Sequence, residues 1–215
     1  MPSPRDFEAV RSAEAFRVET GVSRETAERL DLYVDHLLKW QKRLNLIGRS
    51  TIPEIWTRHI LDSAQLMNHL PPDCRTLVDL GSGAGLPGLV LAILGVPDVH
   101  LIESDTRKAV FLREAARLTG TPVTVHSKRV DQCSGITGDV ITARALAPFH
   151  VLLDMARPFA HKGTVMVFPK GQDSQKELEM ADLDAGVYVQ TLSSQTSAQG
   201  VVLRVTLDGH FDSHR

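Results

Sequence analysis

Apolar residues recur at helical spacing through the first third of the chain. Between residues 24 and 43 they stand three or four positions apart with charged residues between them, and Ser23 precedes the run as a helix N-cap. A second helix is predicted after Thr51-Ile52-Pro53-Glu54, a capping box with proline in the first turn, and Pro71-Pro72 ends it. The buried stripe of this second helix would consist of Trp56, Ile60 and Met67. Residues 23–72 are therefore predicted to form a helical cap, and the polar residues 1–22 a flexible N-terminal arm.

After Pro72 the pattern changes to short apolar runs that alternate with helical runs. Strands are predicted at 76–80, 99–103, 123–126, 139–143 and 164–168, and helices at 87–94, 106–118 and 174–184. Val110, Phe111 and Leu118 are the expected inward positions of the second of these helices. Strands at 187–192 and 201–207 follow with no helix between them, which indicates an antiparallel pair. Residues 73–215 are thus predicted to form a doubly wound, mostly parallel α/β sheet with an antiparallel C-terminal end.

Composition and charge exclude several classes of protein. The chain has 215 residues, of which 42% are hydrophobic, enough for one large domain with a real core. The net charge of −2 excludes a uniformly basic nucleic-acid binder but not a local basic patch. Two distant cysteines, no long apolar run and no secretory signal favour a cytoplasmic protein without a membrane span. No histidine stands at metal-ligand spacing, so no metal is expected.

The densest signal is the glycine-rich stretch from Asp79 to Gly88, placed where the first predicted strand meets the first helix. Gly83, Gly85 and Gly88 fit the dinucleotide fingerprint, with Glu103 about 20 residues further on as a ribose partner. Gly81, Gly83 and Gly85 after Asp79 instead resemble the first motif of class I S-adenosylmethionine-dependent methyltransferases. An adjacent carboxylate would repel a pyrophosphate but suits the ammonium and sulfonium of adenosylmethionine. We therefore favour a methyltransferase with a Rossmann-like, seven-stranded sheet over a NAD-dependent oxidoreductase.

Three further residues are candidate cofactor ligands. Glu103 closes the second strand and could accept hydrogen bonds from both ribose hydroxyls, or be a solvated loop acid. Val130 could pack on the adenine ring, and Asp131 or a backbone amide could bind the exocyclic amine, unless Asp131 is only a helix cap.

The loop after the fourth strand, residues 142–147, indicates which kind of atom accepts the methyl group. It has no NPPY or DPPY tetrapeptide, no Pro-Cys pair and no acid to pair with Lys170, so it lacks the motifs for exocyclic amines, pyrimidine carbons and ribose hydroxyls. A ring nitrogen with a free lone pair needs no base, and catalysis then rests on positioning and desolvation. Arg144 could bind the cofactor carboxylate, or a phosphate or guanine face of the substrate, unless it is a plain surface residue. Arg144 and Lys170 are the candidate catalytic residues, as positioning groups.

An ordered set of motifs resembles the RsmG (GidB) family of bacterial small-subunit rRNA methyltransferases over residues 24–207. The segments are Leu44-Asn45-Leu46, Arg58-His59-Ile60-Leu61-Asp62-Ser63, the glycine loop, Ser127-Lys128-Arg129-Val130, Thr142-Ala143-Arg144-Ala145 and Lys170-Gly171-Gln172. The resemblance implies S-adenosyl-L-methionine as cofactor and guanine N7 in the decoding region of 16S rRNA as target. Its cofactor residues correspond here to Gly81, Leu86, Val130, Asp131 and Arg144. The family usually has two glutamates where Asp131-Gln132 stand, so this chain departs from the family at the expected adenine contact.

The expected RNA contacts are basic residues around the pocket: Arg49, Arg58, His59, Lys128 and Lys170. Arg58, His59 and Asp62 could equally form a structural network, because Arg58 and Asp62 lie four apart on one helix face. Lys39, Lys42 and Arg43 more readily form the solvated face of their helix, and the late acids, Glu177 among them, are expected to lie away from the pocket.

We expect a monomer acting on the small ribosomal subunit or its precursor. A ribosome-assembly factor that binds RNA without catalysis is the alternative from another class.

Overall fold

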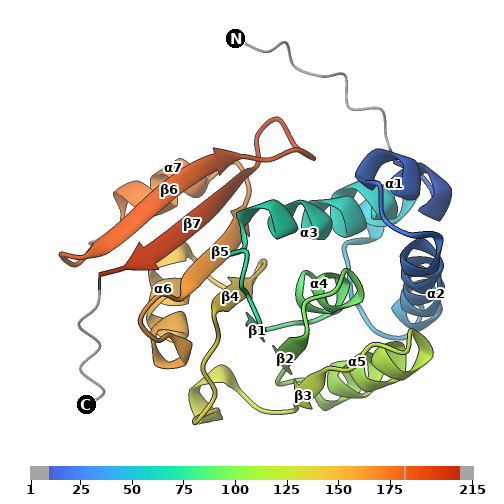
Figure 1. The fold of residues 1–215 in the computed structure, drawn as a ribbon, viewed down its shortest axis with the longest axis horizontal. Coiled ribbons are helices and arrows are strands. Elements are labelled where there is room, and N and C mark those ends of the chain that lie inside the picture. Colours follow the sequence, from blue (N-terminus) through green and yellow to red (C-terminus); the bar gives the residue numbers. More distant parts are fainter. Residues whose placement is uncertain (1–9, 182, 209–215) are drawn as a thin grey trace.

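Seven strands form one sheet in the order β3-β2-β1-β4-β5-β7-β6 (Figure 1). The computed structural model describes residues 10–181 and 183–208. Strands β1 to β5 run parallel, while β7 pairs antiparallel with both β5 and β6. Their bounds are β1 Thr76–Leu80, β2 Asp98–Ile102, β3 Thr124–His126, β4 Val140–Ala143, β5 Val165–Lys170, β6 Val187–Ser193 and β7 Val201–Leu207. The predicted doubly wound sheet with an antiparallel end is confirmed.

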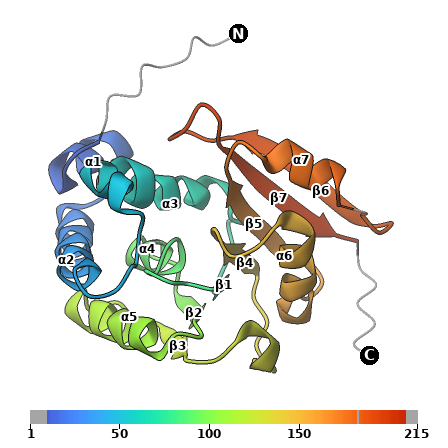
Figure 2. The same ribbon diagram turned by 180° about the vertical axis from the view of Figure 1, so that it is seen from behind.

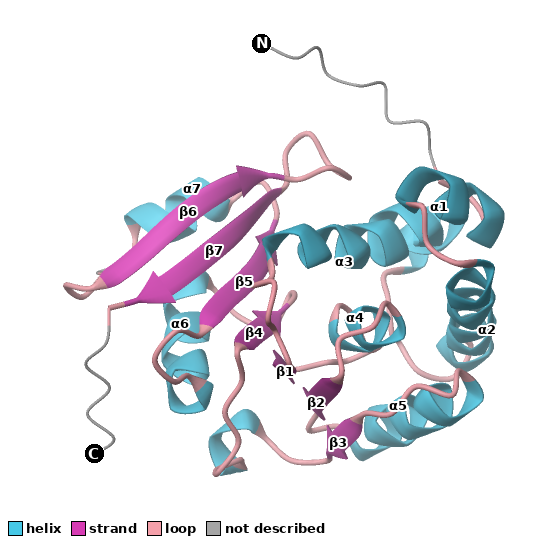
Figure 3. Cartoon of the chain, in the orientation of Figure 1, coloured by secondary structure: helices cyan, strands magenta, loops and turns pink. Residues whose placement is uncertain are grey.

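Helices cover both faces of the sheet (Figure 3). One face packs against α2 (Arg24–Gln41), α4 (Gly88–Ile93) and α5 (Thr106–Leu118), whose apolar side chains share one core with β1 and β2. The other face packs against α6 (Phe149–Ala156) and α7 (Ser174–Glu179), which lie in front of the sheet when it is seen from behind (Figure 2). Because β1, β4 and β5 lie between the two layers, they are apolar on both faces, as buried parallel strands are.

The N-terminal segment differs from the flexible arm predicted for 1–22. Residues Ala13–Thr20 form helix α1, with the Ser12 side chain accepting a hydrogen bond from the Ala15 amide as N-cap. Phe16 is fully buried, and its ring centroid lies 5.9 Å from that of Trp56. Phe16 is the buried residue of this two-turn helix, so its sequence shows too little periodicity of apolar positions to predict a helix. Residues 1–9, the rest of the predicted arm, lie outside the described residues, as do 209–215.

The second helical segment of the cap is irregular. It consists of a 3-10 turn η1 (Arg49–Glu54), a π-helical turn η2 (Trp56–Leu61), one α-turn α3 (Asp62–Ala64) and a 3-10 turn η3 (Gln65–His69). The predicted capping box does not form, because the Thr51 hydroxyl donates to the Gly48 carbonyl at 2.7 Å. Trp56 and Ile60 are buried as predicted, but Met67 is exposed, since the change of helix type turns it away from the core.

Two predictions for the α/β part were also wrong. On α5 the expected inward residues Val110 and Leu118 are 44% and 42% exposed, and Leu112 and Ala115 are buried instead. Helix α6 was not predicted, because its eight residues after Pro148 are too few for their apolar spacing to stand out as a helical pattern. The predicted helix at 174–184 is shorter, since α7 ends at Glu179.

Candidate functional site

The glycine loop leaves the end of β1 and turns tightly into α4. Gly81, Gly83 and Gly85 all have positive φ, at 65°, 55° and 84°, which side chains disfavour. The loop is held from two sides: Tyr33 of α2 donates to the Ala84 carbonyl at 2.6 Å, and the Gly83 amide donates to Glu103 Oε2 at 2.8 Å. A Cβ at Gly83 would meet only the Gly81 carbonyl, at 3.7 Å, so the loop is open there. An open backbone cradle between β1 and Glu103 fits an adenosyl ligand.

Asp79 lies beneath this loop rather than facing the space above it. The residue is 1% exposed; its Oδ1 accepts from the Thr142 hydroxyl at 2.7 Å, and its Oδ2 from the Gly88 amide at 3.3 Å. Burial raises the pKa of Asp79 to about 6, against the hydrogen bonds from Thr142, Ser82 and Gly88 that lower it. The sequence predicted a direct contact between Asp79 and the cofactor cation; in the structure its oxygens bond to Thr142 and Gly88, and the contact with the cofactor stays a prediction.

The raised pKa of Asp79 makes folding stability depend on pH in a defined direction. The folded protein keeps this proton at higher pH than the unfolded chain, whose value is 3.8, so the group favours folding below about pH 4. That contribution is lost as the pH rises through about 6. We expect the unfolding free energy of wild type minus that of Asp79→Asn to fall by about 2–3 kcal/mol between these limits. Denaturant titrations at a series of pH values check this; a difference that grows with pH contradicts it.

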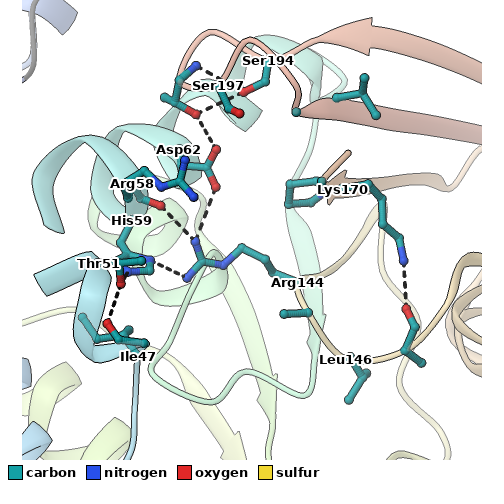
Figure 4. Close-up of a pocket in the computed structure, with 18 of the residues that line it drawn as sticks. Ile47, Thr51, Arg58, His59, Asp62, Arg144, Leu146, Lys170, Ser194 and Ser197 are labelled. Carbon is teal, nitrogen blue, oxygen red and sulfur yellow. Dashed lines mark hydrogen bonds and ion pairs between the residues drawn. The ribbon is translucent and has the colours of Figure 1, made fainter. Parts of the chain in front are cut away.

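A pocket of about 660 Å³ opens beside the glycine loop (Figure 4). Its walls come from the cap, from the loops after β4 and β5, and from the β6–β7 connection, segments far apart in the sequence. The residues that carry its chemistry are Thr51, Arg58, His59, Asp62, Arg144, Lys170, Glu177, Ser194, Thr196 and Ser197. Four of the residues predicted to act in the site, Arg58, His59, Arg144 and Lys170, therefore meet here as expected.

Arg144 connects the loop after β4 to the cap. Its Nη1 lies 3.4 Å from Asp62 Oδ2 and donates to the Arg58 carbonyl at 3.4 Å, and its Nη2 lies 3.0 Å from His59 Nδ1 (Figure 4). The Arg144 side chain is only 18% exposed, so it is not a plain surface arginine. The expected Arg58–Asp62 pair is replaced by Arg144–Asp62, and the Arg58 side chain itself is exposed.

His59 is the neutral centre of this network. Its Nε2 lies 2.7 Å from the Thr51 hydroxyl, whose proton goes to Gly48, so Nε2 carries the hydrogen and Nδ1 accepts from Arg144. Burial, with the nearby charges of Arg144 and Arg58, lowers the pKa of His59 to about 3. An imidazole with this pKa is a poor proton acceptor at neutral pH.

Lys170 has an acidic partner that the sequence did not reveal. Its Nζ lies 2.8 Å from Glu177 Oε2 and donates to the Ala147 carbonyl at 2.8 Å, and Glu177 Oε2 also accepts from the Phe149 amide at 2.8 Å. Glu177 therefore lines the pocket, contrary to the expectation that the late acids lie away from it. The spacing of seven residues between Lys170 and Glu177 does not predict their contact, because it is the turn between β5 and α7 that brings the two side chains together.

The loop between Arg144 and Phe149 is fixed at both ends by these contacts. Between them, Ala145 takes a φ of 53°, a left-handed conformation that is uncommon without glycine, and Leu146 packs against Gly81. A Cβ added at Gly81 would lie 2.6 Å from Leu146 Cδ1. Since Leu146 also lines the pocket, it forms the apolar boundary between the pocket and the glycine loop.

The remaining predicted site residues are placed elsewhere. Leu86 is buried in the core. Val130 is half-buried beside the second core, whereas Asp131 is exposed and lies 3.2 Å from the Arg129 side chain. Lys128 is exposed beyond β3 and does not line the pocket, and Arg49 lines a neighbouring hollow. The direct contacts predicted for these residues stay predictions.

Residues 10–181 and 183–208 offer neither a membrane-spanning helix nor a metal-binding cluster. No helix in them combines the length and apolarity needed to cross a bilayer. These residues also contain no group of three histidine, cysteine or acidic side chains arranged to hold a metal ion.

The sheet order, the antiparallel β7 and the glycine loop after β1 together define the class I methyltransferase fold. An O-methyltransferase from Bacillus cereus, solved in complex with SAH, shares it with a TM-score of 0.61, at 13% identity and covering 91% of this chain and 97% of that one. The family model described as rRNA small subunit methyltransferase G (GidB) matches residues 26–201, and the chain belongs to this family.

Two relatives support the assignment over nearly their whole length. The ribosomal RNA small subunit methyltransferase G of Paramagnetospirillum magneticum is 50% identical over 192 residues, which cover 89% of this chain and 94% of the relative. The enzyme of the same name from Rhodospirillum centenum is 50% identical over 206 residues, covering 96% of this chain and 93% of the relative. The family resemblance inferred from the ordered motifs is thereby confirmed.

Proposed function

We propose that the protein methylates N7 of a guanine in the decoding region of 16S rRNA. Its family makes it a methyltransferase of small-subunit rRNA that uses S-adenosyl-L-methionine. Family membership supports neither an oxidoreductase nor an assembly factor without catalysis. The finer assignment, to a ring nitrogen, rests on the chemistry of the pocket.

The observation that carries this assignment is that the pocket offers no free base. His59 has a pKa of about 3, and both of its nitrogens are engaged. Asp62 accepts from Thr196, Gln65 and Arg144, and Glu177 is held by Lys170 and the Phe149 amide. Guanine N7 has a lone pair in the ring plane and loses no proton when it becomes methylated. A pocket whose acids and imidazole are all occupied therefore suits this acceptor better than an amine or a hydroxyl.

The chain's residues position the reactants. When bound, S-adenosylmethionine supplies an electrophilic methyl group on sulfonium sulfur. The open backbone at Gly83, the turn at Gly81 and Gly85 and the carboxylate of Glu103 would hold its adenosyl part, and Val130 and Asp131 would contact the adenine. Arg144 would hold the methionine carboxylate or the guanine with the donors left after its contacts to the cap. Leu146, which lines the pocket and packs against Gly81, would exclude water from the boundary between the two ligands.

On the substrate side, Lys170, Arg58 and His59 would orient the target nucleotide. Arg49 and Lys128 would contact phosphates farther from the pocket. We further propose that the protein acts as a cytoplasmic monomer on the assembled small subunit or a late precursor, where the target loop is already folded.

Atom replacement in the RNA tests the proposal directly. Small subunits and free 16S rRNA lacking this modification would be incubated with the protein and methyl-labelled cofactor, and N7-methylguanosine mapped by its alkaline lability. We expect one labelled guanine in the decoding region, and no label at that position when 7-deazaguanosine replaces it. Label that survives this replacement, or that lies outside the decoding region, overturns the proposal.

A further inference from the structure

A second hollow lies beside the pocket, enclosed by the connection between α2 and η1. Its volume is about 540 Å³, and its lining consists of Gln41, Lys42, Arg43, Leu44, Asn45, Gly48 and Arg49. Three of these seven residues are cationic and none is acidic, in a chain whose net charge is −2. The local excess of positive charge is therefore concentrated in one short loop, which we call the 41–49 loop.

The cations of the 41–49 loop are not engaged elsewhere in the described part of the chain. Lys42, Arg43 and Arg49 are exposed, and none forms an ion pair with a described acidic side chain. Arg144 and Lys170 in the pocket, in contrast, are already paired with Asp62 and Glu177. Arg58 also lines the pocket and is exposed, so the loop offers three exposed cations to an anionic ligand where the pocket offers one.

The loop is also held in shape from within. The Gln41 side chain accepts from the Leu46 and Ile47 amides at 2.9 and 3.0 Å and donates to the Ile47 carbonyl at 2.8 Å. Leu44 and Ile47 are buried and attach the loop to the core. A loop ordered before binding loses little conformational entropy when it takes up a ligand.

Gly48 lines both the hollow and the pocket, so the two are adjacent. A nucleotide in the pocket remains joined to its neighbours through phosphates, which must leave along the surface beside it. We propose that the 41–49 loop binds the backbone phosphates of the RNA segment next to the methylated nucleotide. This inference rests on the proposed function for the nature of the substrate, and it replaces our expectation that Lys42 and Arg43 form only a solvated helix face.

Salt dependence tests the proposal, because each phosphate contact releases counterions. The variant Lys42→Gln/Arg43→Gln/Arg49→Gln is compared with Arg75→Gln/Arg117→Gln/Lys162→Gln, which removes the same charge from exposed cations near the edge of the sheet where the parallel strands begin. Affinity for small-subunit rRNA is measured over a range of salt concentrations. For the loop variant we expect affinity lower by on the order of a hundredfold and a log–log salt slope shallower by about 2–3. The control variant should keep nearly the wild-type slope.

Three outcomes decide the matter. Equal slopes for the loop and control variants overturn the proposal, provided both variants bind S-adenosylmethionine with wild-type affinity by calorimetry. Competition by millimolar inorganic phosphate at constant ionic strength, seen for wild type and lost in the loop variant, would mark a site for free anions and also overturn it. A shallower slope in the loop variant supports phosphate binding by the 41–49 loop even if N7 methylation is not found. One proposal can therefore fail without the other.

The variant Gln41→Ala tests the order of the loop independently of charge. It keeps all three cations and removes the hydrogen bonds that shape the loop. We expect weaker RNA binding with an unchanged salt slope, and unchanged cofactor affinity. Wild-type RNA affinity in this variant would contradict the role given to the ordered loop.

Discussion

Replacement of Arg144 by alanine is expected to lower methyl transfer about a hundredfold and the unfolding free energy by about 2 kcal/mol. The loss of activity follows because Arg144 is the charged donor group between the glycine loop and the pocket. The loss of stability follows because Asp62, whose side chain is 20% exposed, then lacks its cationic partner and His59 lacks a donor. A plain surface arginine would contribute less, below about 1 kcal/mol. Labelled methyl incorporation and thermal melting measure the two effects.

The variant Arg144→Lys serves as the matched control. Lysine keeps the charge but cannot reach Asp62, His59 and the Arg58 carbonyl together from one planar group. We expect part of the stability to return and activity to stay low. Near-normal activity in Arg144→Ala, accompanied by a large fall in melting temperature, would show that the residue only joins the cap to the sheet.

Replacement of Gly88 by alanine is expected to lower the unfolding free energy by about 2–3 kcal/mol. An added Cβ would lie 2.6 Å from Leu101 Cδ2 and 2.7 Å from Asp79 Oδ2, and both neighbours are buried. Gly88 would have to move away from Asp79, which weakens the hydrogen bond from its amide to that carboxylate. Denaturant unfolding measures the effect, and cofactor affinity should fall with it because the glycine loop loses its support.

Gly83→Ala separates binding from stability in the same loop. Its Cβ would point into open space, so the only cost in the free protein is the left-handed φ of 55°, about 1 kcal/mol. We expect the affinity for the cofactor, measured by calorimetry, to fall at least about tenfold, since the alanine side chain occupies space above the loop. Wild-type affinity in Gly83→Ala would place the cofactor elsewhere.

The positions of the strands along the chain could be predicted because each is a short apolar run with its own boundary signals. Predicted β1 and helix α5 have the same bounds in the structure, and the antiparallel end followed from the missing helix between β6 and β7. Helix α1 was missed since its stability comes from Phe16 packing on Trp56, a contact 40 positions away in the sequence. Periodicity records which side of a segment is apolar but not what the segment packs against.

In the site, too, local patterns predicted individual residues but not their contacts with distant segments. Arg144, Lys170, Arg58 and His59 were found because each stands in a motif or at a strand end, and such ends converge at one edge of a parallel sheet. The residues that bond to these side chains, and so fix their position and charge, were not predicted. Glu177 and Thr196 reach the pocket through turns whose course no local pattern encodes, and the burial of Asp79 depends on how α4 packs above it.

The β6–β7 connection gives the site an order of assembly. The Thr196 hydroxyl donates to Asp62 Oδ1 at 2.6 Å, and the Gln195 amide donates to Gln65 at 2.7 Å, across about 130 positions of sequence. The glycine loop and its supports at Tyr33 and Glu103 all lie in the first half of the chain. During synthesis, the residues of the glycine loop and its supports thus emerge well before the last wall of the pocket. The pocket is completed only when β7 has paired with β5, so the cap and the glycine loop can fold before the pocket beside them has its last wall.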